Sequence, residues 1–303
     1  MDAQSFFQQF GTEEQCVAHL KALRESKGLR CKKCNSERQS WLSTRLQWEC
    51  MACKFRTGIR SGTLFQHSHV PIHKWYHAIY FMTETKKSIS SLELQRKLGM
   101  TRIATVWYLQ QRIRIMMGGA DNQAVRLSGE IELDDAFITA VIPKSKGKKD
   151  NEDPPKRGRG SQRKHPVVVM VESESNNSNK GKCGNLKMIA TESINTPAIN
   201  EIRNTVLKNV HTARTDAHPA YRQLGNRLNH IFQVTVGEQA GKLLPWVHIA
   251  ISNIKRLLNG INHFISARYL QYYLDEFVFK FNNRFSSSKF DNLLGHVTKP
   301  ILY

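Results

Sequence analysis

The sequence predicts an α/β protein in which a cysteine-bearing module and a helical region precede a mixed-sheet core. Two Cys-x-x-Cys pairs lie within residues 28–57, apolar residues recur with a helical period over 72–117, and β-branched runs begin at residue 127. Strands in succession, followed by a helix, a strand and further helices, indicate a mixed sheet with helices packed on it. At 303 residues the chain is long enough for two or three domains. The expected parts are residues 1–60, 61–125 and 126–303.

The first part combines a short N-terminal helix with a metal-binding module. Fifteen residues separate the two Cys-x-x-Cys pairs, which is the spacing of a zinc ribbon. The four expected ligands are Cys31, Cys34, Cys50 and Cys53. Four thiolates leave no open position for a substrate, so the Zn²⁺ is expected to be structural. The alternative is four buried cysteines without a metal. Lys32 and Lys33, inside the first pair, suit contact with phosphate.

The second part is expected to be helical. WYHAIYFM is an apolar run, ISSLELQRKLGM is amphipathic, and TRIATVWYLQQRIRIMM forms a longer third segment. The LGM break puts Gly99 at a turn between the last two segments. The pattern is that of a helix-turn-helix, a common DNA-binding unit.

The third part alternates strands and helices. Strands are expected over 127–142, PVVVMVE, LKMIATE and HTARTDAH. Helices are expected over 197–209 and over most of 245–284. A basic loop, residues 144–165, separates the first two strands and contains Arg157 and Arg159.

Two acidic residues at strand ends are candidates for a catalytic metal site. Asp134 interrupts an apolar strand, where a carboxylate is costly unless it is paired or binds a cation. Asp216 follows a short strand. Alternation places Glu132 and Asp134 on one face of the strand and Asp135 on the other. Mg²⁺ or Mn²⁺ would suit such oxygen ligands, while the alternative is that both residues are ordinary turn or strand-end aspartates.

The charge of the chain points to a polyanionic partner. Lysine and arginine total 45 against 25 acidic residues, a net charge of +20, which favours nucleic acid over a merely solvated basic surface. No run of eighteen apolar residues and no secretory signal is present, so we expect no membrane partner and a cytoplasmic, nucleoid-associated location.

Taken in order, these motifs resemble the bacterial insertion-sequence transposases of family 1595 over roughly residues 16–285. The similar stretches include SGTLFQHSHVPIHKWYHAIYFM, GEIELDDAFI, KRGRGSQRKHPVVVMVE, RTDAHPAY and the tail from LPWVHIAISNIKR onward. The resemblance implies an RNase-H-like core in which Asp134 is the first catalytic acid and Asp216 the second.

Two residues are candidates for the third position of the catalytic site. Many relatives carry Glu followed by Lys seven positions later, and counting back from Lys255 reaches His248. A subgroup with Asn at this position points instead to Asn253, which the resemblance favours. A five-residue offset on a helix rotates the side chains by about 140°, which weighs against both residues serving one site.

The resemblance further implies a DNA transposase that cleaves transposon ends and joins them to target DNA by two-metal phosphoryl transfer. Self-association on double-stranded DNA is expected. Contacts with DNA are expected from Lys255, Arg256, Lys32, Lys33, Arg157 and Arg159. The alternatives are a catalytically inactive, sequence-specific DNA-binding protein and a metal-dependent nuclease that does not join ends.

Overall fold

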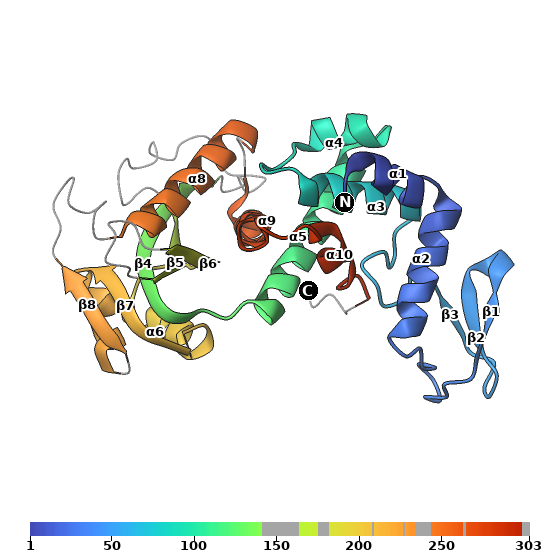
Figure 1. Cartoon of the computed structure of the whole chain (residues 1–303), viewed down its shortest axis with the longest axis horizontal. Helices are drawn as coiled ribbons and strands as arrows, with labels where there is room; N and C mark the ends of the chain where they lie inside the picture. Colours follow the sequence, from blue (N-terminus) through green and yellow to red (C-terminus); the bar gives the residue numbers. More distant parts are fainter. Residues whose placement is uncertain are drawn as a thin grey trace, which may run out of the picture. The chain divides into compact units, whose positions relative to one another are not determined.

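A computed structural model gives the fold of the chain in two compact units (Figure 1). The first comprises Met1–Gly119 with Ser286–Tyr303, and the second comprises Ala120–Phe285. The division at residues 60 and 125 that the sequence suggests stays a prediction. The structure describes residues 1–140, 164–174, 182–207, 209–226, 228–233, 244–262 and 265–298.

The first unit begins with two helices and a small antiparallel sheet. The Thr12 hydroxyl accepts a hydrogen bond from Gln15 N, and the Gln15 side chain accepts one from Thr12 N, so a capping box starts the second helix. The sheet follows in the order β1-β2-β3 and lies in the predicted ribbon. These elements are α1 (Ala3–Phe10), α2 (Glu13–Ser26), β1 (Gln39–Leu42), η1 (Ser43–Arg45), β2 (Gln47–Cys50) and β3 (Arg56–Gly58).

The rest of the first unit is helical, as the sequence predicts for its central part. The helices are α3 (Ile72–Glu84), α4 (Ser91–Leu98), α5 (Ile103–Ala124) and α10 (Lys289–Leu294). Helix α10 was not expected. It joins this unit because Phe290, 1 % exposed, packs edge-on against Phe6 with ring centroids 5.2 Å apart. Phe6 in turn stacks on Tyr80 at 3.9 Å. Aromatic contacts of this kind therefore tie the end of the chain to its beginning.

The second unit is built on a five-stranded mixed sheet of order β6-β5-β4-β7-β8. The central strand β4 pairs antiparallel with β5 and parallel with β7; β5 and β6 are antiparallel, and β7 and β8 are parallel. This topology confirms the RNase-H-like core. The edge strand β8 was not expected. The strands are β4 (Ser128–Thr139), β5 (Lys164–Glu174), β6 (Lys182–Ala190), β7 (Asn209–Asp216) and β8 (Asn229–Gln233).

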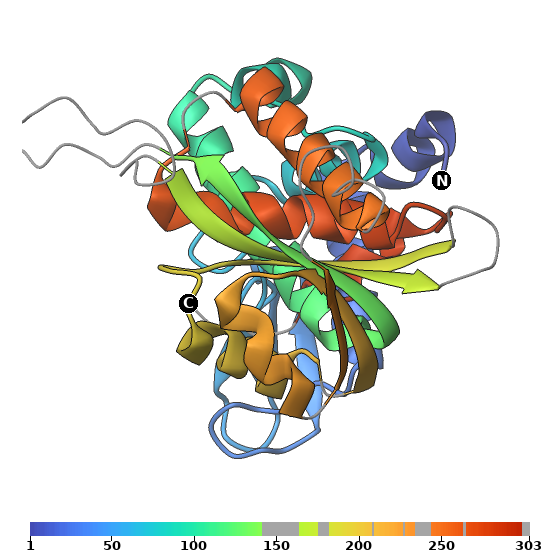
Figure 2. The ribbon, with the colours of Figure 1, turned by 90° about the vertical axis from the view of Figure 1, so that its left-hand side faces the viewer.

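Helices cover both faces of this sheet, with the α8 and α9 side and the α6 side visible in Figure 2. Ala136 and Ile138 of β4 pack with the helices α8 and α9, whereas Ile131 and Leu133 pack with α6 and η2. The predicted alternation is confirmed, because β4 turns its even-numbered residues toward α8 and its odd-numbered residues toward η2. The covering elements are α6 (Thr196–Thr205), η2 (Pro219–Asn226), α8 (Pro245–Ile261), η4 (Ala267–Tyr269) and α9 (Leu270–Asn282).

Within the part of the chain that the structure describes, none of the helices has the length and apolar character needed to cross a membrane.

Candidate metal centres

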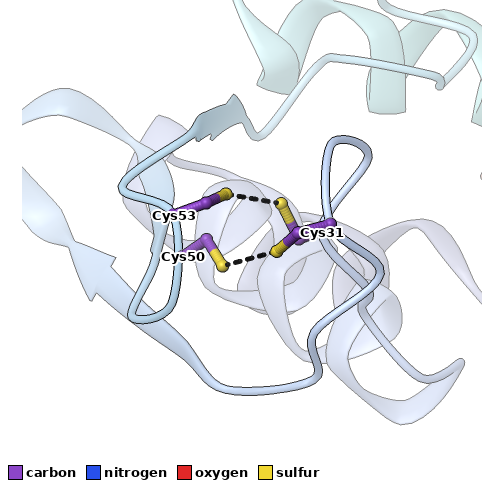
Figure 3. A group of neighbouring side chains, drawn as sticks. Cys31, Cys50 and Cys53 are labelled. Carbon is purple, nitrogen blue, oxygen red and sulfur yellow. Dashed lines mark hydrogen bonds between the residues drawn. The ribbon is translucent and has the colours of Figure 1, made fainter.

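The four predicted zinc ligands converge in the ribbon. The Sγ atoms of Cys31 and Cys53 are 3.5 Å apart, as are those of Cys34 and Cys50, and Figure 3 shows the sulfurs turned toward one another. All four sulfurs lie within 4.8 Å of each other. The cysteines come from two separate turns, so the sheet between the turns brings them together.

The two turns have the same local geometry. Asn35 N donates to Cys31 O at 2.9 Å, and Lys54 N donates to Cys50 O at 2.9 Å. Asn35 and Lys54 both adopt the left-handed region, with φ of 59° and 58°. Each Cys-x-x-Cys segment therefore folds into an equivalent tight turn with both sulfurs on one side, which explains why the spacing alone identified it.

The sulfur cluster fits a tetrahedral Zn²⁺. Zn–S bonds of about 2.3 Å place tetrahedral sulfurs roughly 3.8 Å apart, close to the observed spacing. The pKa of Cys50 is lowered to about 6, mainly because Cys53 N donates a hydrogen bond to its sulfur. Backbone N–H groups that favour a thiolate also prepare a metal ligand.

The ribbon is fixed to α2 by a buried arginine. Arg24 Nη1 donates to Gly58 O at 2.8 Å and to Ile59 O at 2.7 Å, and its guanidinium lies over the Trp48 ring at 4.8 Å. The cysteine cluster is thus attached to the helices of its own unit by charge-assisted hydrogen bonds and a cation–π contact.

A second cluster, made of carboxylates, lies in the sheet of the other unit. Ligand oxygens of Asp134, Asp135 and Asp216 all lie within 4.8 Å of one another. The parallel pairing of β4 with β7 ends at Leu133 and Thr215, so Asp134, within β4, and Asp216, the last residue of β7, lie side by side just beyond it. This register explains why two aspartates that are 82 positions apart in the sequence converge.

The carboxylates of this cluster disfavour one another's ionised form. Burial raises the pKa of Asp134 to about 7, and the negative charges of Asp135 and Asp216 raise it further, against the opposing effect of Lys255. Only 14 % of the Asp134 side chain is exposed. A divalent cation bound here would neutralise the negative charge of the three carboxylates.

Two further contacts orient the other carboxylates. Tyr221, fully buried beneath the sheet, donates its hydroxyl hydrogen to Asp135 Oδ1 at 3.2 Å. Burial raises the pKa of Tyr221 well above its ordinary value, so the phenol remains protonated and can donate. Asp216 Oδ1 accepts from His218 N at 3.1 Å. Asp135 therefore reaches the cluster from the η2 face and Asp134 from the α8 face.

The start of α8 is held by Glu132, two residues before Asp134 on the same face of β4. Glu132 is fully buried, and its Oε2 accepts from Trp246 N at 2.8 Å and from Val247 N at 2.9 Å. A carboxylate at a helix N-terminus satisfies free N–H groups and interacts favourably with the helix dipole. The sequence pattern placed Glu132 on the correct face of β4 but did not indicate that it caps α8. The feature that could have revealed this role is a glutamate inside an apolar strand, where a carboxylate needs a partner.

Helix α8 brings His248, and not Asn253, toward the acids. His248 Nδ1 lies 3.8 Å from Asp134 Oδ2. Lys255, seven residues later and on the same helix face, is close enough to lower the pKa of Asp134. Asn253 is exposed and is rotated by about 140° from His248 around the helix axis.

The remaining predicted contact residues that the structure describes are exposed. Lys32, Lys33 and Arg256 are exposed, which is compatible with binding a polyanion. Arg157 and Arg159 lie outside the described residues.

Comparison with known families matches both the cysteine-bearing module and the sheet unit. Residues 126–282, just over half of the chain, match the ISXO2-like transposase domain, and residues 11–56 match the transposase zinc-ribbon domain. The chain belongs to this transposase family. The two matches cover the unit with the carboxylates and the module with the cysteines, in the order that the sequence predicts.

Individual relatives are more distant. An uncharacterized protein in transposable element ISH50 of Halobacterium salinarum is 25 % identical over 175 residues, 54 % of this chain and 56 % of that protein. The chain thus aligns with little more than half the length of that relative. Two solved structures, a pre-cleavage Mos1 transpososome and the Mos1 strand transfer complex, are each 12 % identical. Their TM-scores are 0.30 and 0.31, over 75 % and 76 % of this chain and 78 % of each Mos1 chain. Neither alignment bears on the site.

Proposed function

We propose that the chain is a DNA transposase that cleaves transposon ends and joins them to target DNA by metal-dependent phosphoryl transfer. The observation that carries this proposal is the convergence of Asp134, Asp135 and Asp216 where the parallel pairing of β4 with β7 ends, in a member of a transposase family. Carboxylates held this close together in a partly buried position repel one another, and a divalent cation would neutralise that charge.

Asp134 and Asp216 are the proposed ligands of Mg²⁺ or Mn²⁺, which take hard oxygen donors. Two such ions, when bound, activate the attacking oxygen and stabilise the leaving oxygen of an in-line displacement. Asp135 accepts a hydrogen bond from Tyr221, which fixes its carboxylate at the edge of the same cluster. The β4–β7 register holds the two proposed ligands in place before any substrate binds.

For the third site residue we propose His248. Its ring nitrogen faces Asp134, and Lys255 lies on the same face of α8, which reproduces the spacing of seven seen in many relatives. An imidazole is a neutral ligand, so it supplies less charge than the Glu of those relatives but retains a lone pair for coordination. Asn253 fits the resemblance to a subgroup but lies on a different face of the helix.

The basic residues around both centres are proposed to hold DNA. Lys255, whose charge acts on Asp134, and its sequence neighbour Arg256 are exposed on α8, where they suit the phosphates of a transposon end. In the ribbon, a structural Zn²⁺ held by the four cysteines would fix the turn that displays Lys32 and Lys33. Arg157 and Arg159 remain proposed DNA contacts from sequence alone. Self-association on paired ends and a nucleoid location also remain predictions.

A strand-transfer assay tests this proposal. The purified chain is incubated with a labelled transposon-end duplex, supercoiled target DNA and Mg²⁺ or Mn²⁺, with omission of the cation as the blank. Because a catalytic metal stabilises the transition state by several kcal/mol, Asp134→Asn and Asp216→Asn should reduce joining by about a thousandfold or more. Glu201→Gln, which removes an exposed carboxylate of α6, is the matched control and should leave joining unchanged.

The products distinguish the proposal from its alternatives. Cation-dependent joined product that disappears in both Asp variants supports a transposase. Cut but unjoined ends would show a nuclease. Tight end binding with no product in either metal would show a DNA-binding protein without catalysis, and either of these results overturns the proposal.

A further inference from the structure

The edge strand β8 lies beside β7, the strand that ends in Asp216 (Figure 1). The two strands pair in parallel, with Ala213 opposite His230. Both large apolar side chains of β8 are largely exposed, Ile231 by 44 % and Phe232 by 60 %, so the strand adds little to the hydrophobic core. Its inward contribution to the end of β7 is instead a polar one, the imidazole of His230.

His230 contacts β7 through Thr215, the residue immediately before Asp216. Its Nε2 lies 2.8 Å from Thr215 Oγ1. Thr215 is fully buried, and its Oγ1 also lies 2.6 Å from the main-chain oxygen of Asp216. A buried hydroxyl that is hydrogen-bonded on both sides is fixed in one orientation, because any other would leave a polar group without a partner.

The direction of the two hydrogen bonds follows from the hydrogens available. The main-chain oxygen of Asp216 can only accept, so Thr215 donates its single hydroxyl hydrogen to that oxygen. The Thr215 oxygen then accepts from His230, which assigns a hydrogen to Nε2 of the ring. Burial lowers the pKa of His230, so near pH 7 the ring is neutral and Nε2 is its donor. A chain of donors therefore runs from His230 through Thr215 to Asp216.

This chain fixes Asp216 at a point where the central strand no longer does so. The pairing of β4 with β7 ends at Thr215, one residue before Asp216. Beyond it, the Asp216 main-chain oxygen accepts from Thr215 and the Asp216 carboxylate accepts from His218 N at 3.1 Å. The peptide and the side chain of Asp216 are thus both oriented, and in a reaction site a displacement of about 1 Å can lower the rate about a hundredfold.

We propose that His230 is a positioning residue of the carboxylate centre: through Thr215 it fixes the peptide of Asp216 and thereby the direction of the Asp216 carboxylate. The inference rests on the proposed function, since it takes Asp216 as a metal ligand. Groups that hold a metal ligand in place contribute a factor of about 10–100 to metal affinity or activity. The edge strand β8 then serves the site, because it carries His230.

Calorimetric titration of the full chain with Mn²⁺, without DNA, tests the assignment. His230→Ala should weaken Mn²⁺ binding about tenfold, and Thr215→Val, which removes the hydroxyl, should do the same. Because the two side chains act in series, the double variant should bind about as strongly as either single variant, whereas independent contributions would multiply to about a hundredfold loss. His230→Gln, whose amide can donate from a similar position, should recover most of the affinity.

The opposite end of β7 provides a matched control. His211 Nδ1 lies 3.2 Å from Thr212 Oγ1, so the same two residue types form a contact away from Asp216. His211→Ala, at an exposed position, should leave Mn²⁺ affinity unchanged. In the strand-transfer assay, His230→Ala should raise the Mn²⁺ concentration needed for half-maximal joining about tenfold. Partial unfolding would instead lower the maximal joining at an unchanged half-maximal concentration.

The outcomes separate this inference from the proposed function. Unchanged Mn²⁺ affinity in both single variants, losses that multiply in the double variant, or an equal loss in His211→Ala would each overturn the role of His230 and leave the proposed function intact. Wild-type protein that binds Mn²⁺ but forms no joined product would overturn the proposed function, while the titrations still decide the role of His230. Wild-type protein that binds no Mn²⁺ would overturn both.

Discussion

The two candidate metal centres differ in how complete their ligand sets are. In the ribbon, four sulfurs surround one point and leave no position open. In the sheet, three carboxylates converge with a histidine beside them. A saturated tetrahedral set is suited to stability, whereas an incomplete oxygen set leaves room for substrate oxygens. From this difference we infer that the chain uses the saturated centre to fold, and we propose the incomplete one for chemistry.

The centres differ equally in what holds them. Each cysteine pair is shaped by its own tight turn, with the backbone hydrogen bonds Asn35 N to Cys31 O and Lys54 N to Cys50 O. The carboxylates depend on strand register and on a helix fixed through Glu132. Substitutions in the cysteine turns should therefore change zinc binding directly. Substitutions in β4 or α8 should change the carboxylate cluster by moving its residues. Five predictions test this difference, from the largest expected effect to the smallest.

Replacing one thiolate should have the largest effect. Cys50→Ser is expected to remove zinc and to destabilise the ribbon by several kcal/mol, on the order of what a structural zinc contributes in small domains. Zinc content and the fluorescence of Trp48 measure this. Cys183→Ser, at a half-buried cysteine of β6, is the matched control and should retain zinc. If Cys50→Ser keeps a full equivalent of zinc, the ribbon is not the site.

Without a divalent cation, the carboxylate cluster should make stability depend on pH. The carboxyl of Asp134 ionises near pH 4 when unfolded and near pH 7 when folded, so the folded protein binds the extra proton between these values. Stability should therefore fall as pH rises from about 4 to 7 and level off above. At pH 8, Asp134→Asn should be more stable than wild type by at most about 4 kcal/mol, as measured by chemical denaturation.

Adding Mn²⁺ should reverse this effect only where the ligand is present. Wild-type protein should be stabilised at pH 8, and Asp134→Asn should not. Asp275→Asn provides the control, because burial also raises the pKa of Asp275 to about 7 while its hydrogen-bond partner is Gln271. The pH dependence of stability should change in Asp275→Asn, whereas its stabilisation by Mn²⁺ should equal that of the wild-type protein. Equal stabilisation of all three proteins would place the cation elsewhere.

Removing the cap of α8 should disturb the second centre alone. Glu132→Ala leaves two backbone N–H groups without their acceptor and should destabilise the protein by about 2–4 kcal/mol. Glu132→Gln retains an acceptor oxygen and should restore most of the loss. Glu130→Ala, at a partly exposed residue of the same strand, should cost less than about 1 kcal/mol. A loss of zinc in Glu132→Ala would contradict the independence of the two centres.

The smallest effect should separate His248 from Asn253. His248→Ala is expected to weaken Mn²⁺ binding about tenfold or more, because a ring nitrogen near Asp134 is lost. Asn253→Ala, at an exposed position on another face of α8, should leave Mn²⁺ binding unchanged. Calorimetric titration of both variants decides between them, and the reverse pattern would restore the assignment to Asn253.

The sequence by itself determined the features that depend on local spacing. The cysteine turns follow from residues three apart, and the faces of β4 follow from alternation, which correctly separated Glu132 and Asp134 from Asp135. The order of helices and strands likewise follows from local apolar periods. These features form within short segments, so they can be predicted without knowledge of distant contacts.

Only the tertiary structure decided which distant residues meet. Asp134, Asp135 and Asp216 meet where the parallel pairing of β4 with β7 ends, and Glu132 caps α8 although 114 positions separate it from Trp246. The rotation of α8 turns His248 toward Asp134. Strand β8 and helix α10 are too short for their periods to stand out, and they are stabilised by pairing with β7 and by the aromatic contacts of Phe290. Packing energy from residues far apart in the chain fixes these choices, and no local pattern records it.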